Sequence, residues 1–298
     1  MALVAPASPF ERAAFDAGVA ELERLGFVAT YRAGIFERDG FVAGPPGRRA
    51  RELMWAFEEP NVDAILAVRG GYGSVEVLPH LDADRIADRI ARRRTAVVGY
   101  SDVTSLHAFL NTRVGLVTVH GPMLEGRLAA GPSAYDLASF LGSLDVEPLG
   151  ELPVNGVEVI RAGEARGPLF GGTLTQILAS FGTPYEFDPP AGHVLFLDEV
   201  GERPYRLHRM LTQYRLAGRF ARAAAVVIGQ LPRCDEPGGT PTGLSVVREL
   251  LADFPGPVLA GFPSGHATSP LVSLPFGVEA LVSAGGAPKL VMLEGAAA

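Results

Sequence analysis

The stretch Thr95-Ala-Val-Val-Gly-Tyr-Ser-Asp-Val-Thr-Ser-Leu-His-Ala-Phe-Leu110 changes from one structural pattern to another. Its short apolar run, residues 96–98, is typical of a buried strand. Gly99 then indicates a sharp turn, and the apolar residues within 102–110 have the spacing of a helix that faces a core. The sequence therefore predicts a strand, a turn and a helix, with Ser101 at the junction above the carboxyl end of the strand.

Two interpretations of Ser101 follow from this position. A serine at a helix start exposes its hydroxyl beside free backbone N–H groups, which can stabilise developing negative charge. This is how a nucleophile elbow works, although Val103 stands where the last glycine of G-x-S-x-G would be. The alternative is that Ser101 or Asp102 only caps the helix. On this stretch alone the cap is the favoured interpretation.

The composition is that of an ordinary globular protein with an acidic balance. The chain has 298 residues, of which 48% are hydrophobic and 20% charged, and its formal net charge is −7. This length predicts about two domains, and the negative charge argues against a nucleic-acid partner. The single cysteine, Cys234, excludes an internal disulfide. With no signal peptide and no run of about 18 apolar residues, we expect a cytoplasmic protein without a membrane partner.

The first half alternates strand and helix patterns in the order of a βαβ unit, which predicts a parallel sheet with right-handed crossovers. We therefore expect an open parallel α/β domain of the flavodoxin or Rossmann type, with sites at the carboxyl ends of its strands. The expected strands are 2–5, 27–31, 64–68, 96–98 and 116–119, and the expected helices are 10–25, 48–58, 75–78, 86–94 and 102–110.

The second half has a weaker, mixed pattern. Residues 151–167 alternate like short antiparallel strands. We place a boundary near Gly150, which divides the chain into an α/β domain at 1–150 and a mixed α+β domain at 151–298. Further expected strands are 194–197, 224–228, 258–260 and 290–293, and further expected helices are 174–181, 205–217 and 244–254.

A glycine-rich loop, Val68-Arg-Gly-Gly-Tyr-Gly73, directly follows a predicted buried strand. Its glycines let the backbone approach a ligand closely and point N–H groups into one concavity. A glycine-rich turn without a ligand is the alternative. The loop does not match the motif G-x-G-x-x-G, so we discount a dinucleotide-binding site and expect no cofactor.

A carboxylate and a histidine follow two further predicted strands. Asp198 and Glu199 end the strand 194–197, and because neighbouring strand residues face opposite sides, at most one of them points into a given pocket. His266 lies in a loop bounded by glycine and proline, which suits catalysis better than a core position does. His120 is a second histidine expected to line the cleft. No histidine or cysteine set has metal-ligand spacing, so we expect no metal.

Several segments, taken in one order along nearly the whole chain, resemble the LD-carboxypeptidase family. These are serine peptidases that trim murein tetrapeptides, and they include the microcin C immunity peptidases. The segments are Val4-Ala-Pro-Ala-Ser8, Ala67-Val-Arg-Gly-Gly-Tyr-Gly73, Gly99-Tyr-Ser-Asp102, His120-Gly-Pro-Met123, Gly171-Gly-Thr-Leu174, Glu202-Arg-Pro-Tyr205 with Arg209-Met-Leu211, Gly265-His266, and Leu274-Pro-Phe-Gly277.

The resemblance implies a catalytic triad. Ser101 would be the nucleophile and His266 its general base, which later protonates the leaving amine. The family usually has glutamate directly after the leucine that ends the strand, whereas this chain has Asp198 there and Glu199 next. We expect Asp198 to orient the histidine, which with its shorter arm requires a backbone or loop shift. Glu199 is the alternative.

The resemblance also implies the rest of the site. Backbone N–H groups of Gly71 and Asp102, with Gly70 as a further possibility, would form the oxyanion hole. Arg69, Tyr72 and His120 are the expected substrate-binding residues. The reaction expected is hydrolysis of the bond between the L-centre of lysine or diaminopimelate and a terminal D-alanine in recycled muropeptides, by a homodimer. The alternatives are a microcin-immunity-like amidase and a non-catalytic α/β ligand-binding protein.

Overall fold

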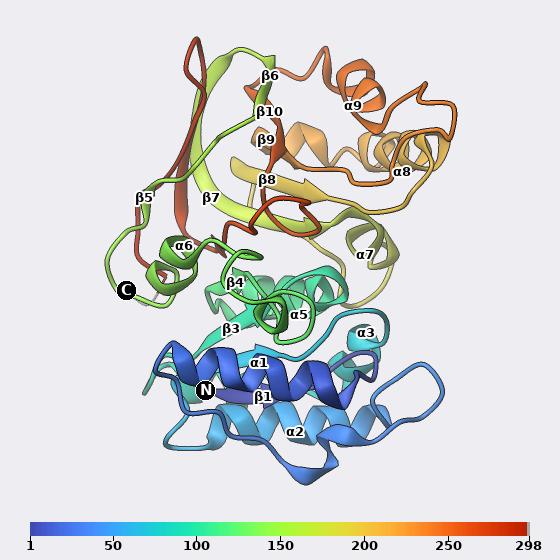
Figure 1. The fold of residues 1–298 in the computed structure, drawn as a ribbon. Coiled ribbons are helices and arrows are strands. Elements are labelled where there is room, and N and C mark those ends of the chain that lie inside the picture. The colour runs from blue at the N-terminus through green and yellow to red at the C-terminus, as the bar shows by residue number, and fades with distance from the viewer. Residues whose placement is uncertain (297–298) are drawn as a thin grey trace.

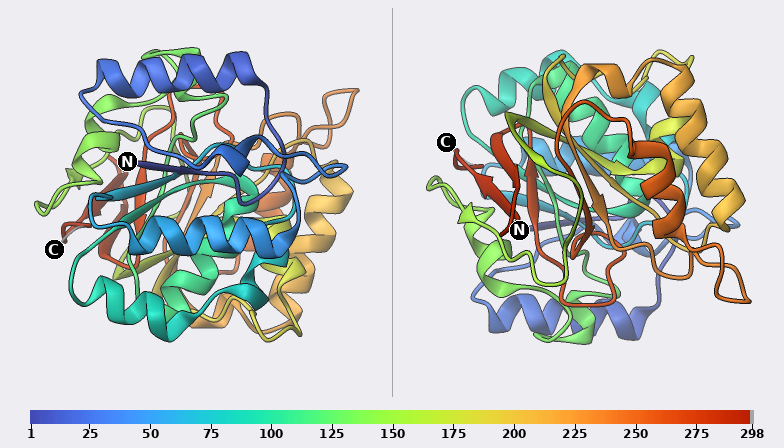
Figure 2. Two further views of the ribbon diagram at one scale, coloured as in Figure 1. Left: turned by 90° about the horizontal axis from the view of Figure 1, so that it is seen from below. Right: turned by 90° about the horizontal axis from the view of Figure 1, so that it is seen from above.

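The computed structural model describes residues 1–296, which form two β-sheets with helices packed against them (Figures 1 and 2). The N-terminal half builds the lower sheet in the view of Figure 1, and the C-terminal half builds the upper one. The fold is mixed α/β, as the sequence predicted, and parallel strands occur in both sheets. Among the described residues, no helix is long and apolar enough to cross a membrane.

The first sheet has five strands in the order β1-β2-β3-β4-β11. The first four run parallel and are almost completely buried, which explains why the sequence shows them as continuous apolar runs. The fifth comes from the C-terminal half and pairs antiparallel with β4 at the edge, where its proline costs no ladder hydrogen bond. The bounds are β1 Ala2–Val4, β2 Ala64–Ala67, β3 Ala96–Gly99, β4 Thr118–His120 and β11 Leu274–Phe276.

The strand expected at 27–31 is absent. Only Thr30 forms a parallel bridge, with Ala2 on the outer side of β1. Neighbouring Val28 is 80% exposed, so this segment lacks the two covered faces that sustain a buried parallel strand. The bridge still gives the first sheet a doubly wound order. The chain runs from β1 to Thr30 on one side of it and then returns to β2 on the other side. Ligands in such sheets bind at the carboxyl ends of the strands near this change of direction.

Helices cover both faces of the first sheet. Helix α1 packs on one face and ends before Gly26, whose φ of +87° suits a C-terminal cap. Helices α2, α4 and α5 pack on the other face. Alternate residues of β1 serve the two cores: Leu3 faces α1, and Ala2 and Val4 face α2. The bounds are α1 Arg12–Arg24, α2 Pro46–Glu58, α3 Ser74–Val77, α4 Ala83–Ile90, α5 Thr104–Phe109 and α6 Leu137–Gly142.

The second sheet has eight strands in the order β5-β13-β12-β7-β8-β9-β10-β6. Its central four, β7 to β10, run parallel, and its outer strands are antiparallel to their neighbours, so the predicted mixed architecture is confirmed. Strands β11 and β12 were not predicted from the sequence. The bounds are β5 Gly150–Glu151, β6 Glu158–Arg161, β7 Gly163–Thr173, β8 His193–Asp198, β9 Ala223–Gly229, β10 Val258–Phe262, β12 Glu279–Ala284 and β13 Lys289–Met292.

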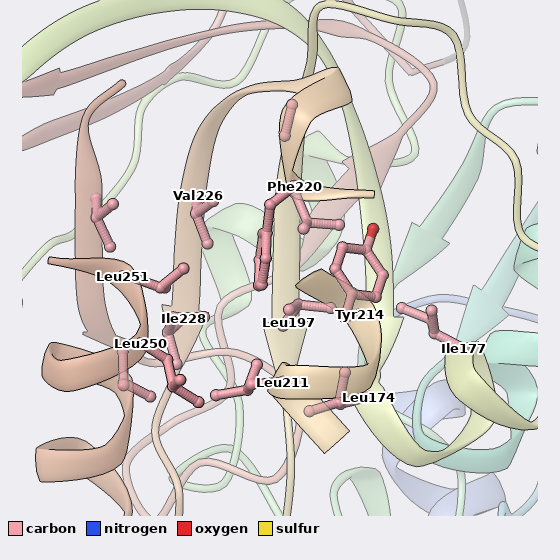
Figure 3. Close-up of a cluster of buried hydrophobic side chains, with 14 of the residues drawn as sticks. Leu174, Ile177, Leu197, Leu211, Tyr214, Phe220, Val226, Ile228, Leu250 and Leu251 are labelled. Atoms are coloured by element: carbon pink, nitrogen blue, oxygen red, sulfur yellow. The ribbon is translucent and has the colours of Figure 1, made fainter. Parts of the chain in front are cut away.

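Three helices cover one face of the second sheet and enclose its main core. These are α7 (Leu174–Ala179), α8 (Pro204–Leu216) and α9 (Gly243–Leu251). Figure 3 shows leucines of α8 and α9 meeting Val226 and Ile228 of β9, with Tyr214 and Phe220 closing one end. This core fixes β8, the strand that ends in Asp198. A division of the chain near Gly150 stays a prediction.

Candidate active site

Ser101 occupies a strained turn between β3 and α5. Its φ is +65°, in the left-handed region, and it starts the short 3₁₀ turn Ser101–Val103 that leads into the helix. A non-glycine residue in this region costs about 1–3 kcal/mol, and such strain concentrates at functional sites. The turn holds the serine side chain up at the carboxyl edge of the first sheet, where it is partly exposed. This is the geometry expected of a nucleophile elbow.

The structure brings Ser101, His266 and Asp198 together from three distant segments. His266 Nε2 lies 3.0 Å from Ser101 Oγ, and His266 Nδ1 lies 2.7 Å from Asp198 Oδ2. Ser101 follows β3 of the first sheet, Asp198 ends β8 of the second, and His266 lies in the loop after β10. The site therefore forms where the carboxyl ends of both parallel sheets meet. A serine hydrogen-bonded to a histidine that is bonded to a carboxylate is the arrangement of serine hydrolases.

Asp198 is fully buried yet ionised. Burial alone would raise its pKa, but hydrogen bonds and the charge of His266 outweigh this and lower the pKa of Asp198 to about 2. The Oδ2 atom accepts from both the ring Nδ1 and the backbone N–H of His266, the latter at 3.0 Å. The Oδ1 atom accepts from Thr173 Oγ1 at 2.8 Å. The carboxylate is therefore held in one orientation by donors on both oxygens.

Glu199 points away from the histidine. Its Oε2 accepts from the backbone N–H and hydroxyl of Thr175, at 3.0 and 2.6 Å. Burial raises the pKa of Glu199. Alternation along β8 thus separates the two carboxylates as expected. The structure places Asp198, and not Glu199, beside His266.

The candidate oxyanion donors lie in the glycine loop and directly after Ser101. An ideal Cβ on Gly70 would lie 2.9 Å from Ser101 Cβ and 3.3 Å from the backbone N of Asp102, so only glycine lets this loop come so close. Gly71 has a φ of +99°, and a side chain there would overlap that of Ser8. Among the described residues, the N–H groups of Gly71 and Asp102 donate to no protein acceptor. The Asp102 side chain points elsewhere and accepts from Ser74 N at 2.7 Å.

The expected substrate-binding residues fall into two groups. Arg69 and Tyr72 flank the glycine loop, and their side chains are 45% and 46% exposed. Tyr72 packs edge-on against exposed Phe41, with ring centroids 5.4 Å apart. Both residues are thus accessible at the rim.

His120 does not line the cleft, contrary to expectation. It is completely buried at the end of β4, stacked on Phe276, and its Nδ1 lies 3.2 Å from Ser264 Oγ. Burial lowers the pKa of His120 to about 3, so the ring is neutral. It lies directly beneath Gly265, where a Cβ would be 3.0 Å from its Cε1. His120 therefore supports the histidine loop from below and cannot contact a substrate from there.

Two polar residues that the sequence analysis missed fix the histidine loop. Arg127 donates to four backbone carbonyls, two of which, those of Gly265 and Ala267, flank His266, at 3.0 and 2.6 Å. Gln230 Oε1 accepts from the backbone N–H and hydroxyl of Thr268, at 2.8 and 3.0 Å. Each is an isolated polar residue in a loop, and the sequence carries no signal for its distant partners.

Arg49 is the corresponding anchor on the side of the glycine loop. Its side chain is completely buried, although it belongs to an amphipathic helix on which an arginine normally faces solvent. It donates to the carbonyls of Pro6, Gly44 and Gly73 at 2.6 to 2.8 Å and pairs with Glu76 at 2.5 Å. One guanidinium thus ties together the three loops that form this wall of the site.

Comparison with known proteins identifies the family of this chain. Residues 1–121 match the LD-carboxypeptidase N-terminal domain, and residues 166–282 match the LD-carboxypeptidase C-terminal domain. A probable murein peptide carboxypeptidase of Bacillus subtilis is 30% identical over 98% of this chain and 90% of its own. The microcin C7 self-immunity protein MccF of Escherichia coli is 26% identical over 92% and 87% of the two chains. The crystal structure of a muramoyltetrapeptide carboxypeptidase from Oxalobacter formigenes superimposes with a TM-score of 0.84, at 26% identity over 98% of both chains.

The fold and the family matches define a hydrolase with a mixed α/β architecture. The chain belongs to the LD-carboxypeptidase family and is an enzyme of the peptidase class. The resemblance inferred from the sequence motifs is confirmed.

Proposed function

We propose that this enzyme is a serine carboxypeptidase that releases the terminal D-alanine of murein tetrapeptides, by hydrolysing its bond to the L-centre of the diamino acid. The observation that carries the proposal is the unbroken hydrogen-bonded series from Ser101 Oγ through the His266 ring to Asp198. Family membership supports the substrate class, since the relatives include a probable murein peptide carboxypeptidase.

The chemistry proposed follows from these contacts. Ser101 Oγ attacks the carbonyl carbon of the scissile amide while His266 Nε2 takes its proton. Asp198 holds the ring with Nδ1–H toward itself and stabilises the imidazolium. The N–H groups of Gly71 and Asp102 would receive the oxyanion. His266 then gives its proton to the leaving amine of D-alanine, and water, activated by the same histidine, releases the peptide from the acyl-enzyme.

The test is D-alanine release from purified tetrapeptide. We expect Ser101→Ala to lower kcat at least about a thousandfold, with the fold unchanged by circular dichroism. Ser283→Ala, on β12 of the second sheet, is the matched control and should keep full activity. Unchanged D-alanine release by Ser101→Ala would exclude the serine mechanism. Absence of release by the unmodified enzyme would favour another substrate or a non-catalytic ligand-binding role.

A second substrate class is favoured by the match to MccF, a microcin immunity protein. The same serine and histidine would then cleave an amide in an acylated aminoacyl-adenylate analogue. Incubation with a peptidyl sulfamoyl-adenylate separates the two proposals. Cleavage of that compound without cleavage of tetrapeptide would favour the immunity function.

A cytoplasmic location stays a prediction from the sequence, and a homodimer stays a prediction that rests on the family resemblance. Sedimentation equilibrium of the purified chain checks the second: a mass of one chain across the working concentration range would contradict the dimer.

A further inference from the structure

Arg69 and Glu125 form an ion pair on the rim next to Ser101. Arg69 directly precedes Gly70, the residue in closest approach to Ser101. Glu125 follows β4, and its backbone N–H donates to the carbonyl of Val68 at 2.8 Å. The pair thus joins the segments that follow β2 and β4, on either side of β3 and its serine.

The pair has unused bonding capacity. Arg69 Nε lies 3.3 Å from Glu125 Oε2, and Arg69 Nη1 donates to the carbonyl of Pro9 at 3.1 Å. Among the described residues, no acceptor bonds Arg69 Nη2. Glu125 Oε1 accepts from the backbone N–H of Glu11 at the long distance of 3.4 Å. The arginine side chain is 45% exposed and the glutamate 19%, so both are accessible at this rim. The long pair distance and this exposure leave the two charges only partly compensated by each other.

A cation and an anion side by side match a ligand that carries both charges on one carbon. The terminal carboxylate of D-alanine does not qualify, because its nitrogen is in the scissile amide and Glu125 would repel the carboxylate. The side chain of diaminopimelate does qualify: its end bears an ammonium and a carboxylate on the same carbon. Lysine has the same chain and the ammonium but lacks that carboxylate.

We propose that Arg69 and Glu125 bind the zwitterionic end of a diaminopimelate side chain and so select this diamino acid over lysine. Arg69 Nη2 takes the carboxylate and Glu125 takes the ammonium, each by a charge-assisted hydrogen bond. The inference rests on the proposed function for the placement of the scissile bond at Ser101.

Arg69 and Glu125 contact different groups of the ligand, so the contribution of each can be measured separately. The kcat/KM for D-alanine release is measured with three tetrapeptides: the diaminopimelate form, the same peptide with that side-chain carboxylate amidated, and the lysine form. We expect the unmodified enzyme to prefer the first by roughly 10- to 100-fold, the value of one hydrogen bond to a charged group. Arg69→Gln should abolish this preference through KM, with a larger fall in kcat/KM for the diaminopimelate peptide than for the other two. Glu125→Gln should lower kcat/KM by a similar factor for all three peptides.

Control variants and a binding assay separate the outcomes. Arg38→Gln removes bonds to Phe10 and Glu11, so it loosens the same N-terminal segment that Arg69 touches through Pro9, and it should leave the preference intact. Equal losses on all three peptides in Arg69→Gln, or no preference in the unmodified enzyme, would overturn the inference. Calorimetric binding of the same peptides to Ser101→Ala reads the preference without catalysis. Selective binding without any D-alanine release would refute the proposed function and keep the inference; equal binding of all three would refute the inference itself.

Discussion

One carboxylate oxygen of Asp198 accepts two hydrogen bonds from His266, from the ring Nδ1 at 2.7 Å and from the backbone N–H at 3.0 Å. The second bond shows that the backbone of the histidine loop itself approaches the carboxylate. Gly265 makes this possible, because its φ is +67° and a Cβ there would overlap Asp198 Oδ2. The histidine loop therefore lies close enough for the short side chain of Asp198 to reach it.

Lengthening this carboxylate should harm the enzyme. We expect Asp198→Glu to lower kcat at least tenfold, because an added methylene in a packed site costs about 1–3 kcal/mol and must displace the histidine loop. Asp198→Asn keeps the shape but favours the wrong tautomer, with a loss of about 10⁴-fold in comparable triads. Kinetics on tetrapeptide measure both, with Glu199→Gln as control. A larger loss in Glu199→Gln than in Asp198→Asn would reverse the assignment.

Gly265→Ala tests the close approach directly. The added Cβ meets the carboxylate and the residue has a left-handed backbone, so we expect kcat to fall a hundredfold or more and the ring to leave Asp198. The proton NMR signal of the His266 Nδ1–H should shift or vanish in the variant. Gly285→Ala, where a Cβ meets no atom within 4 Å, is the control. Full activity in Gly265→Ala would show that the histidine loop can move away from Asp198 without loss of catalysis.

Arg127→Met removes the donor that holds the histidine loop. Four carbonyls lose a donor, so we expect a loss of unfolding free energy on the order of 3 kcal/mol and a lower kcat. Urea unfolding and tetrapeptide kinetics measure the two effects. Arg166→Met, at an exposed pair with Glu279, should change neither by much. An unchanged kcat in a destabilised Arg127 variant would confine this arginine to a purely structural role.

Arg49→Lys tests the anchor of the glycine loop. Lysine keeps the charge but cannot reproduce the fork that serves three carbonyls and Glu76, so we expect kcat to fall about tenfold or more with little change in KM. Arg51→Lys, exposed on the same helix, is the matched control. If KM rises instead while kcat holds, the arginine shapes the substrate site and not the oxyanion hole.

Stability should decrease in mildly acidic solution because of His107. Burial lowers the pKa of His107 to about 4, from an ordinary value of 6.5, so between these values only the unfolded chain takes up the proton. This favours unfolding as the pH falls from about 6.5 to 4, by up to roughly 3 kcal/mol. Urea midpoints over this range should show a shallower slope in His107→Gln than in His208→Gln, a surface control. Equal slopes would contradict the assignment.

Local sequence determined much of this protein. Buried strands such as β2 and β3 appear as apolar runs, and α1 ends at its glycine, because burial and backbone conformation select residue types within a few positions. The glycine loop, the turn at Ser101 and the loop that carries His266 were located in the same way, since close approach and sharp turns demand particular residues. Their catalytic roles were implied only by the family resemblance. The series of motifs identified the family. The strand expected at 27–31 does not form, because its faces are not covered.

Tertiary structure alone decided the rest. Whether Asp198 or Glu199 meets His266 depends on the register of β8 and on the path of a loop from another strand. The burial of His120, the anchoring roles of Arg49 and Arg127, and the insertion of β11 into the first sheet each join residues far apart in the chain. Such partners leave no periodic trace in the sequence, because a hydrogen bond or a strand pairing depends on positions in space that the packing of both sheets defines.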